Sequence, residues 1–240
     1  MPAADRRLLV VGAHAADFVW RSAGAIALTT RGGGKAMAVA LSYGARGESG
    51  ELWSQPEQTL ERVVRARHEE ATAAAEMLGA DFVCFDLGDY PLDVDGRALE
   101  RLADLMREFE PDTVITHTPK DPFNPDHPVA HAAAVRAEQL ATGAGRAAAF
   151  KTIRQPQVYF FEPHHPDSSE FVPNVYLDIT AVHEIKAKAM AAIASQRFMP
   201  DYQVMRARQR AWQAQRISGR TTIEYVEVFQ RFTPQVVNSL

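Results

Sequence analysis

The sequence contains a single cysteine, Cys84, so a disulfide within the chain is impossible. This scarcity favours a reducing compartment, and we expect a cytoplasmic protein. No apolar run is long enough to span a bilayer, and the short polar stretch 1–7 does not resemble a signal peptide. A formal net charge of -4 offers no basic surface, so we expect no nucleic-acid or membrane partner.

The sequence also lacks a glycine-rich phosphate-binding loop. The triple glycine 32–34 follows a predicted helix and not a strand, so we interpret it as a helix stop. Hydrophobic residues make up 46% of the 240 residues, which is enough to fill a sizeable core. A chain of this length predicts a single domain over residues 1–240.

Apolar, β-branched runs alternate along the chain with amphipathic segments. Strands are predicted at 8–11, 37–41, 81–85, 112–117, 157–161, 175–179 and 221–232, and helices at 21–31, 56–78, 97–109, 128–139, 181–195 and 203–216. This alternation predicts a Rossmann-like α/β fold, with a mostly parallel sheet and helices on both of its faces.

Polar side chains gather directly after predicted strands. The four clusters are His14 with Asp17, Arg46 with Glu48, the segment 117–131 and the segment 162–165. Because ligands bind beyond the carboxyl ends of parallel strands, four such loops can converge on one site.

The turn after the first predicted strand offers an imidazole and a carboxylate three residues apart, His14 and Asp17. Two histidines and one carboxylate with an open position form a catalytic zinc arrangement, and we choose His14, Asp17 and His127 as ligands. Asp126 is a candidate to orient the imidazole of a metal ligand without binding the metal itself. The alternative is that Asp17 caps the next helix and His14 is an ordinary loop histidine.

Two further histidines have open roles. His131 follows His127 by four residues, so both can face one side at the start of the predicted helix. We place His131 with Asp126 behind the ligands, although it can equally be a histidine packed within the helix. His117 either caps the end of its strand or touches the metal or the substrate.

The motifs Ala13-His14-x-x-Asp17 and Asn124-Pro125-Asp126-His127 resemble those of the PIG-L or LmbE-like superfamily of zinc-dependent deacetylases. The superfamily motifs are Ala-His-Pro-Asp-Asp and His-Pro-Asp-His. The resemblance implies an LmbE-like fold, a Zn²⁺ cofactor and zinc ligands at His14, Asp17 and His127. It extends through Lys186 to Ser195-Gln196 and therefore covers most of the chain.

Two departures from the superfamily motifs affect the expected activity. The deacetylase general base is replaced by Ala16, and the histidine that opens the second motif is replaced by Asn124. A hydrolase of this kind needs a base for the attacking water and a group that stabilises the tetrahedral intermediate. The sequence therefore predicts that the metal is retained while the machinery for amide hydrolysis is lost.

Longer motifs resemble one branch of the superfamily, the 4-oxalomesaconate (4-carboxy-2-hydroxymuconate) hydratases. They are the runs 13–21, 44–49, 86–91, 120–122 and 161–164. The branch implies addition of water to a tricarboxylate with a conjugated double bond, giving 4-carboxy-4-hydroxy-2-oxoadipate in gallate and protocatechuate catabolism. We expect the chain to work as a homo-oligomer.

Hydration requires a polarised oxo group, a base for water and an acid for carbon. Zinc can polarise the oxo group or carry the water. Glu48 and His164 are the candidate acid and base, in either order, and Arg46, Arg21 and Asn124 are candidate substrate contacts. Two alternatives stay open: a zinc-dependent deacetylase or related amidase that uses Glu48 as its base, and a non-catalytic metal- or ligand-binding protein.

Overall fold

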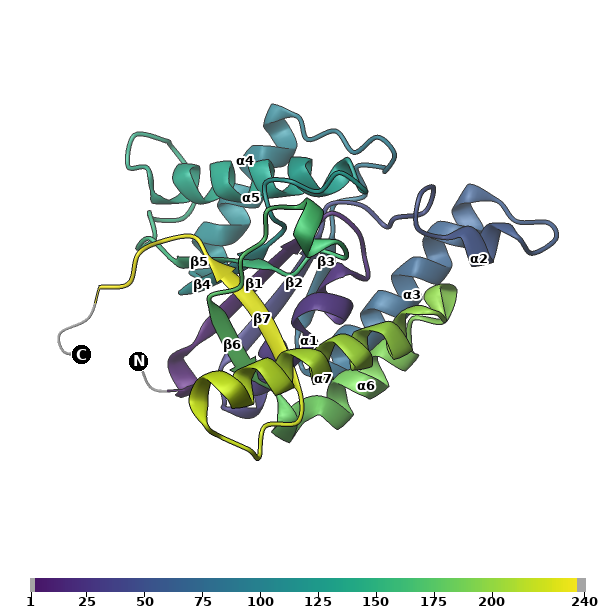
Figure 1. The fold of residues 1–240 in the computed structure, drawn as a ribbon. Helices are drawn as coiled ribbons and strands as arrows, with labels where there is room; N and C mark the ends of the chain where they lie inside the picture. The colour runs from purple at the N-terminus through teal and green to yellow at the C-terminus, as the bar shows by residue number, and fades with distance from the viewer. Residues whose placement is uncertain (1–2, 237–240) are drawn as a thin grey trace.

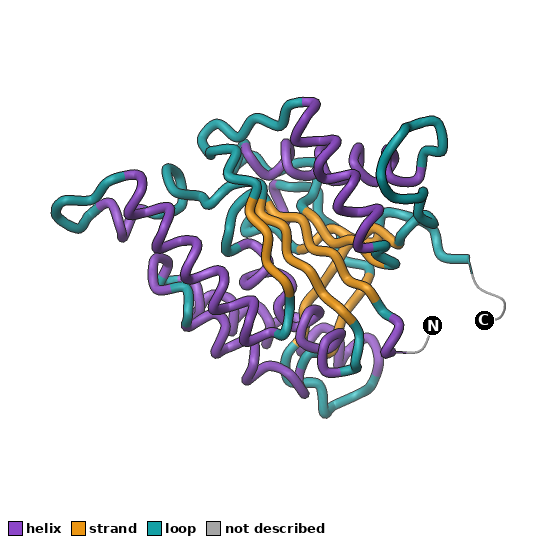
Figure 2. Tube along the Cα trace, turned by 180° about the vertical axis from the view of Figure 1, so that it is seen from behind, coloured by secondary structure: helices purple, strands orange, loops and turns teal. Residues whose placement is uncertain are grey.

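The computed structural model describes residues 3–236 and contains a seven-stranded sheet in the order β3-β2-β1-β4-β5-β7-β6 (Figures 1 and 2). The first five strands along the chain pair in parallel, whereas β7 runs antiparallel to both β5 and β6. The predicted α/β class with a mostly parallel sheet is therefore confirmed. The strands are β1 (Arg7–Gly12), β2 (Lys35–Ala40), β3 (Asp81–Cys84), β4 (Thr113–Thr116), β5 (Gln157–Phe161), β6 (Val175–Asp178) and β7 (Val226–Arg231).

Helices cover both faces of the sheet, as predicted. In Figure 1, α4 and α5 lie together on one side of the strands, and α1, α3 and α6 lie on the other, with α7 beside α6. Within the described residues, no helix is both long and apolar enough to cross a membrane. The helices are α1 (Asp17–Arg31), α2 (Gly50–Trp53), α3 (Leu60–Leu78), α4 (Gly96–Phe109), α5 (Asp126–Thr142), α6 (His183–Ala191) and α7 (Met199–Ser218).

Strand β1 supplies side chains to two hydrophobic clusters. Leu8 and Val10 pack into the cluster that includes α1, α3 and α6, while Leu9 and Val11 pack into the cluster under α4 and α5. Successive side chains of a strand point to opposite faces, so a strand covered on both sides must be apolar throughout. This explains the unbroken run that predicts the strand, and it fixes the end of β1 in the middle of the molecule.

Several predicted boundaries are wrong. The helix predicted at 56–78 begins at Leu60, because the Thr59 side chain accepts a hydrogen bond from the Arg62 N–H and caps it there. The helix predicted at 181–195 ends at Ala191, and the next one begins at Met199, before the predicted residue 203. Strand β7 begins at Val226, five residues after the predicted start at 221.

The order of the strands places two polar segments side by side. Strand β1 lies between β2 and β4, so its carboxyl end is flanked by the carboxyl ends of both. The chain that follows β1 proceeds through α1 to β2, away from β4, and a crevice opens where the strand order reverses in this way. His14 follows β1 and the segment 117–127 follows β4, so both reach this crevice.

Candidate active site and metal centre

Two buried imidazoles at the crevice are each tied to a carboxylate. His14 Nε2 lies 3.1 Å from Asp126 Oδ2, and His127 Nδ1 lies 2.8 Å from Asp121 Oδ2. Among the described residues, the remaining ring nitrogens, His14 Nδ1 and His127 Nε2, have no hydrogen-bond partner although both are buried. A metal-ligating histidine characteristically donates its second N–H to a carboxylate, which leaves the first nitrogen free for the metal.

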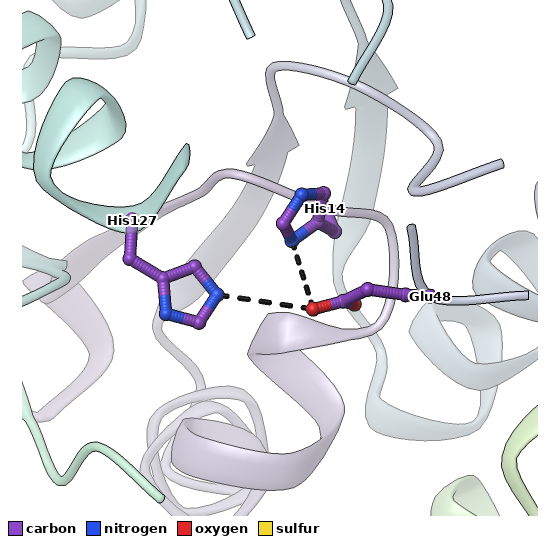
Figure 3. Close-up of side chains that lie close together, drawn as sticks. All are labelled: His14, Glu48 and His127. Carbon is purple, nitrogen blue, oxygen red and sulfur yellow. Dashed lines mark ion pairs between the residues drawn. The ribbon is translucent and has the colours of Figure 1, made fainter. Parts of the chain in front are cut away.

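Two more carboxylates lie at these free nitrogens. Figure 3 shows Glu48 between the two imidazoles, with its Oε1 3.1 Å from His14 Nδ1 and 3.9 Å from His127 Nε2. Asp17 approaches the same atoms, with Oδ2 3.7 Å from His14 Nδ1 and Oδ1 3.8 Å from His127 Nε2. Nitrogen atoms of histidine and oxygen atoms of carboxylates are ligands for zinc. Two overlapping groups of such atoms lie close enough to hold a metal ion: His14, Glu48 and His127, and Asp17, His117 and His127.

The charges of this cluster also favour a cation. Burial lowers the pKa of His14, but the surrounding carboxylates of Glu48, Asp126 and Asp17 outweigh it and raise the value to about 10. Burial raises the pKa of Glu48, yet the imidazoles of His14 and His127 pull it down to about 2. The site therefore places ionised carboxylates beside buried ring nitrogens, and a divalent cation would neutralise the charge of these carboxylates.

Asp17 does not act as a helix cap. Its Oδ2 accepts a hydrogen bond from the His14 N–H at 2.8 Å, which lies before the helix, and α1 receives no side-chain cap from Ala16. Burial raises the pKa of Asp17, but the imidazoles of His117, His127 and His14 hold it well below its usual range. The alternative that Asp17 caps α1 is therefore wrong, and Asp17 faces the imidazole cluster.

His117 belongs to this cluster and was not among the residues chosen from the sequence. Its Nε2 lies 3.0 Å from Asp17 Oδ2 and 3.0 Å from the backbone nitrogen of Ala13, and its ring stacks on His127 with centroids 3.9 Å apart. Burial and the neighbouring His127 lower its pKa to about 3. The signal for this residue was its place at the end of β4. Asp121 was missed as well, because nothing in its local sequence links it to His127.

Arg21 lies behind Asp17 in the next turn of α1. Its Nε is 3.4 Å from Asp17 Oδ1, and its Nη1 donates a 2.9 Å hydrogen bond to the Glu162 carbonyl. Its side chain is 2% exposed, yet Nε and Nη2 have no hydrogen-bond partner within the described structure. The predicted cation is thus next to the cluster, with N–H groups left to bind an anion.

A buried ion pair contacts the backbone of α1 beyond Asp17. Lys186 Nζ donates to the Trp20 carbonyl at 3.0 Å and to Glu227 Oε1 at 2.8 Å. The Glu227 carboxylate in turn accepts from the N–H groups of Gly24 and Ala25, at 2.7 and 2.9 Å. The first turns of α1, which carry Asp17, are therefore fixed from outside the helix.

Asn124 and His131 hold other groups in place. Asn124 Nδ2 donates a 3.0 Å hydrogen bond to Glu48 Oε1, so this residue binds the candidate acid or base directly. His131 Nδ1 donates to the His117 carbonyl at 2.9 Å, and its ring packs on Phe160. His131 therefore supports the end of β4. Its imidazole contacts the His117 backbone and not the free ring nitrogens of His14 and His127.

Arg46 does not reach the cluster, contrary to its predicted role as a substrate contact. Its Nη1 donates to the Asp89 carbonyl at 3.2 Å, and its backbone N–H donates to Asp89 Oδ2 at 2.8 Å. The residue lines a separate cavity with Tyr43 and Asp86. A charged residue in a loop cannot be assigned a direction from sequence, and here Arg46 ties its own loop to the segment after β3.

His164 lies across a pocket from the cluster. A cavity of about 690 Å³ is lined by Glu48, Asn124 and His164 together. Tyr202 Oη donates to the His164 carbonyl at 2.8 Å, which fixes the segment after β5. Burial and the positive charge of Arg21 lower the pKa of His164 to about 3. The adjacent His165 also borders the pocket, but its ring packs on Phe123 with centroids 4.0 Å apart.

A sequence profile of the PIG-L family, described as GlcNAc-PI de-N-acetylase, matches residues 9–138, which is more than half of the chain. The chain belongs to the PIG-L family. The matched PIG-L region contains the His14, Asp17, Glu48 and His127 side chains, whereas His164 lies beyond it.

Individual relatives match almost the whole chain. A 4-oxalmesaconate hydratase of Pseudomonas putida KT2440 is 44% identical over 239 residues, covering 98% of this chain and 93% of the relative. The crystal structure of GalB, the 4-carboxy-2-hydroxymuconate hydratase from P. putida KT2440, superposes with a TM-score of 0.95 at 44% identity, covering 98% of this chain and 99% of that one. The N,N'-diacetylchitobiose deacetylase of Pyrococcus horikoshii, with a TM-score of 0.78 at 18% identity and coverage of 95% and 84%, shares the PIG-L fold.

Ala16 stands at the position where the superfamily motif Ala-His-Pro-Asp-Asp has its first aspartate. Ala16 is 1% exposed and packs in the hydrophobic cluster that includes α1 and α3. A methyl group in this position can neither accept a proton nor bind water. Two carboxylates of the cluster also line the large pocket beside His164: Asp121, which is bound to His127, and Glu48.

Proposed function

We propose that the protein is a hydratase that adds water to 4-oxalomesaconate (4-carboxy-2-hydroxymuconate), giving 4-carboxy-4-hydroxy-2-oxoadipate. The observation that carries this proposal is a buried cluster of histidines and carboxylates that could hold a metal ion, while a buried Ala16 stands where the family motif has the deacetylase base. The likeness to two hydratases over almost the full chain supports it. The reaction belongs to the catabolism of gallate and protocatechuate.

His14, Asp17 and His127 would hold a zinc ion, with Asp126 and Asp121 orienting the two imidazoles. When bound, zinc supplies a Lewis acid that polarises oxygen. Glu48 lies close enough to the same nitrogens to be a further ligand, but its carboxylate also receives the Asn124 amide and lines the pocket. We therefore assign Glu48 to the reaction and Asp17 to the metal.

Glu48 and His164 would carry the proton transfers. Hydration forms one C–O bond and one C–H bond at the two carbons of the double bond, so one proton leaves water and one arrives at carbon. Glu48 Oε1 accepts a hydrogen bond from Asn124, so it acts as an acceptor in this structure. We therefore infer that Glu48 takes the proton from water and that His164, on the other wall of the pocket, gives a proton to carbon.

The negative charges of the substrate carboxylates would be balanced by a small number of buried, positively charged side chains. Arg21 is adjacent to Asp17 and retains unpartnered N–H groups, and it is one of the charges that act on His164. Binding of a tricarboxylate would add negative charge close to His164. Such charge stabilises the protonated imidazole, so the substrate itself would help His164 to act as an acid.

The experiment that tests the function is a direct comparison of two substrates. In one assay the purified protein is incubated with freshly prepared 4-oxalomesaconate, and hydration is measured from the ultraviolet absorbance of this substrate. In a second assay it is incubated with N-acetylglucosamine derivatives, and the released acetate is measured. We expect hydration and no deacetylation, because loss of a general base lowers a rate by about 10²- to 10⁴-fold. Robust acetate release would favour the deacetylase, and turnover of neither would favour a binding protein.

The wider context is proposed with the function. The single sheet, with hydrophobic clusters packed on both of its faces, supports one domain over residues 1–240. We also propose that the protein acts in the cytoplasm and assembles as a homo-oligomer. Sedimentation or light scattering of the purified protein measures the assembly directly.

A further inference from the structure

Tyr90 occupies the space beside Gly47, the residue before Glu48. A Cβ atom built on Gly47 would lie 2.1 Å from two carbon atoms of the Tyr90 ring, a distance that real Cβ contacts do not show. Side chains are therefore excluded at position 47 as long as the ring stays where it is. The backbone that carries Glu48 and the Tyr90 ring are in direct contact.

The segment that holds Tyr90 is itself bound on both sides. Asp89 Oδ2 accepts hydrogen bonds from the N–H groups of Arg46 and Gly47, at 2.8 and 2.7 Å. The Tyr90 N–H donates to Asp126 Oδ2 at 3.0 Å, on the carboxylate that also binds His14. Consecutive residues thus connect the loop of Glu48 to the carboxylate that orients a metal-ligand candidate.

The conformation of Tyr90 shows that this placement is imposed by its surroundings. Its φ of 49° lies in the left-handed region, which residues with a side chain seldom adopt. Such conformations persist where neighbouring contacts hold them, and they concentrate at functional sites. The ring lies over His14, with centroids 6.0 Å apart, and it borders the same pocket as Glu48 and His164.

We propose that Tyr90 is a positioning residue, whose ring seated on Gly47 fixes the Glu48 carboxylate against His14 and His127. The proposal rests on the proposed hydratase function and adds to it a residue that acts through Glu48. Burial and the neighbouring Glu48 and Asp126 carboxylates raise the pKa of Tyr90 to about 12, so the phenol is neutral at ordinary pH. The ring, and not a charge on the oxygen, is what contacts Gly47.

The contact between the ring and the backbone predicts that positions 47 and 90 are coupled. Alanine at 47 would push the ring, the Glu48 backbone or both, and a displacement near 1 Å can lower a rate by about 10²-fold. Removing the ring opens the space that a methyl group at position 47 needs. Gly47→Ala should consequently be harmful with Tyr90 present and nearly neutral in a Tyr90→Ala background.

The test measures kcat, KM, bound zinc and the melting temperature for Gly47→Ala, Tyr90→Ala, Tyr90→Phe and the double variant Gly47→Ala/Tyr90→Ala. We expect kcat to fall by about 10²-fold in Gly47→Ala and by about 10-fold or more in Tyr90→Ala, with zinc content unchanged. Tyr90→Phe should restore most of kcat, and the double variant should match Tyr90→Ala. If Gly47→Ala does not fold, the double variant still should.

Three results would overturn the proposal. They are additive losses of kcat from the two alanine substitutions, a loss in Tyr90→Phe as large as in Tyr90→Ala, and loss of zinc in place of kcat. Wild-type protein that does not hydrate 4-oxalomesaconate would contradict the proposed function instead. Unchanged kcat in Tyr90→Ala, with an active wild type, would contradict only the role of Tyr90.

Discussion

The two walls of the site, which are the imidazole cluster and the segment after β5, are built in different ways. On the wall formed after β1 and β4, the side chains themselves are fixed: His14 and His127 are each 1% exposed, and a carboxylate binds each imidazole. On the wall after β5, the hydrogen bonds from Arg21 and Tyr202 fall on the backbone carbonyls of the segment 162–164. The first wall holds imidazoles still, whereas the second fixes the main chain that carries His164.

The family match divides the molecule at the same place. The PIG-L profile covers residues 9–138 and hence the whole first wall, while His164 lies outside it. The hydratase relatives match both walls. We infer that the first wall supplies the metal site common to the fold and that the second wall, with Glu48 facing it, decides the reaction.

The largest effect is expected from removing a metal ligand. His127→Ala should lose its metal and all measurable hydration, because it removes one of the two imidazoles that face the Glu48 and Asp17 carboxylates. Elemental analysis of the folded variant checks this. His131→Ala is the matched control, one turn further along α5, and it should keep about one zinc per chain. Full metal occupancy in His127→Ala would show that His127 is not a metal ligand.

The next effect separates chemistry from metal binding. Glu48→Ala and His164→Ala should each lower kcat by about 10²-fold or more and leave the zinc content normal. A pH–rate profile should lose one limb in one of the two variants, since each removes one of the two groups that transfer protons. Near-native kcat in both variants would show that neither group carries a proton.

A smaller effect on metal affinity is expected from the carboxylates that hydrogen-bond to the candidate ligand imidazoles. Asp121→Asn and Asp126→Asn keep the shape of the side chains but weaken the hydrogen bonds to His127 and His14. Outer partners of this kind typically change metal affinity by about 10- to 100-fold. A zinc-binding titration against a chelator of known affinity measures the change. Unaltered affinity in both variants would mean that these carboxylates do not support a metal.

The smallest effect is expected at the neighbour of His164. Both histidines border the pocket, but the His165 ring packs on Phe123. His165→Ala should therefore reduce kcat far less than His164→Ala, measured side by side. Equal losses would assign the effect to the segment 162–165 as a whole and not to the His164 imidazole.

The sequence predicted the fold and much of the cluster for identifiable reasons. A strand buried on both faces must be apolar, so β1 and the residues after it, His14 and Asp17, could be placed at one edge of the sheet. Helix ends were less certain because local caps such as Thr59 decide them.

Contacts between distant loops could not be predicted. The proximity of His117 to Asp17 depends on how two distant loops meet. The bond between His127 and Asp121 depends instead on how the single segment after β4 folds back on itself. The direction of Arg46 depends on Asp89, which lies 43 residues away in the chain. The fit of Tyr90 against Gly47 likewise requires the folded arrangement of the segments after β2 and β3.

The account rests most directly on hydration that depends on a metal held by this cluster. The decisive measurement is the rate of water addition to 4-oxalomesaconate by one preparation as isolated, after removal of metal with a chelator, and after adding back zinc. The account predicts that hydration is lost with the metal and returns with about one zinc per chain. Full hydration by the metal-free protein would contradict it.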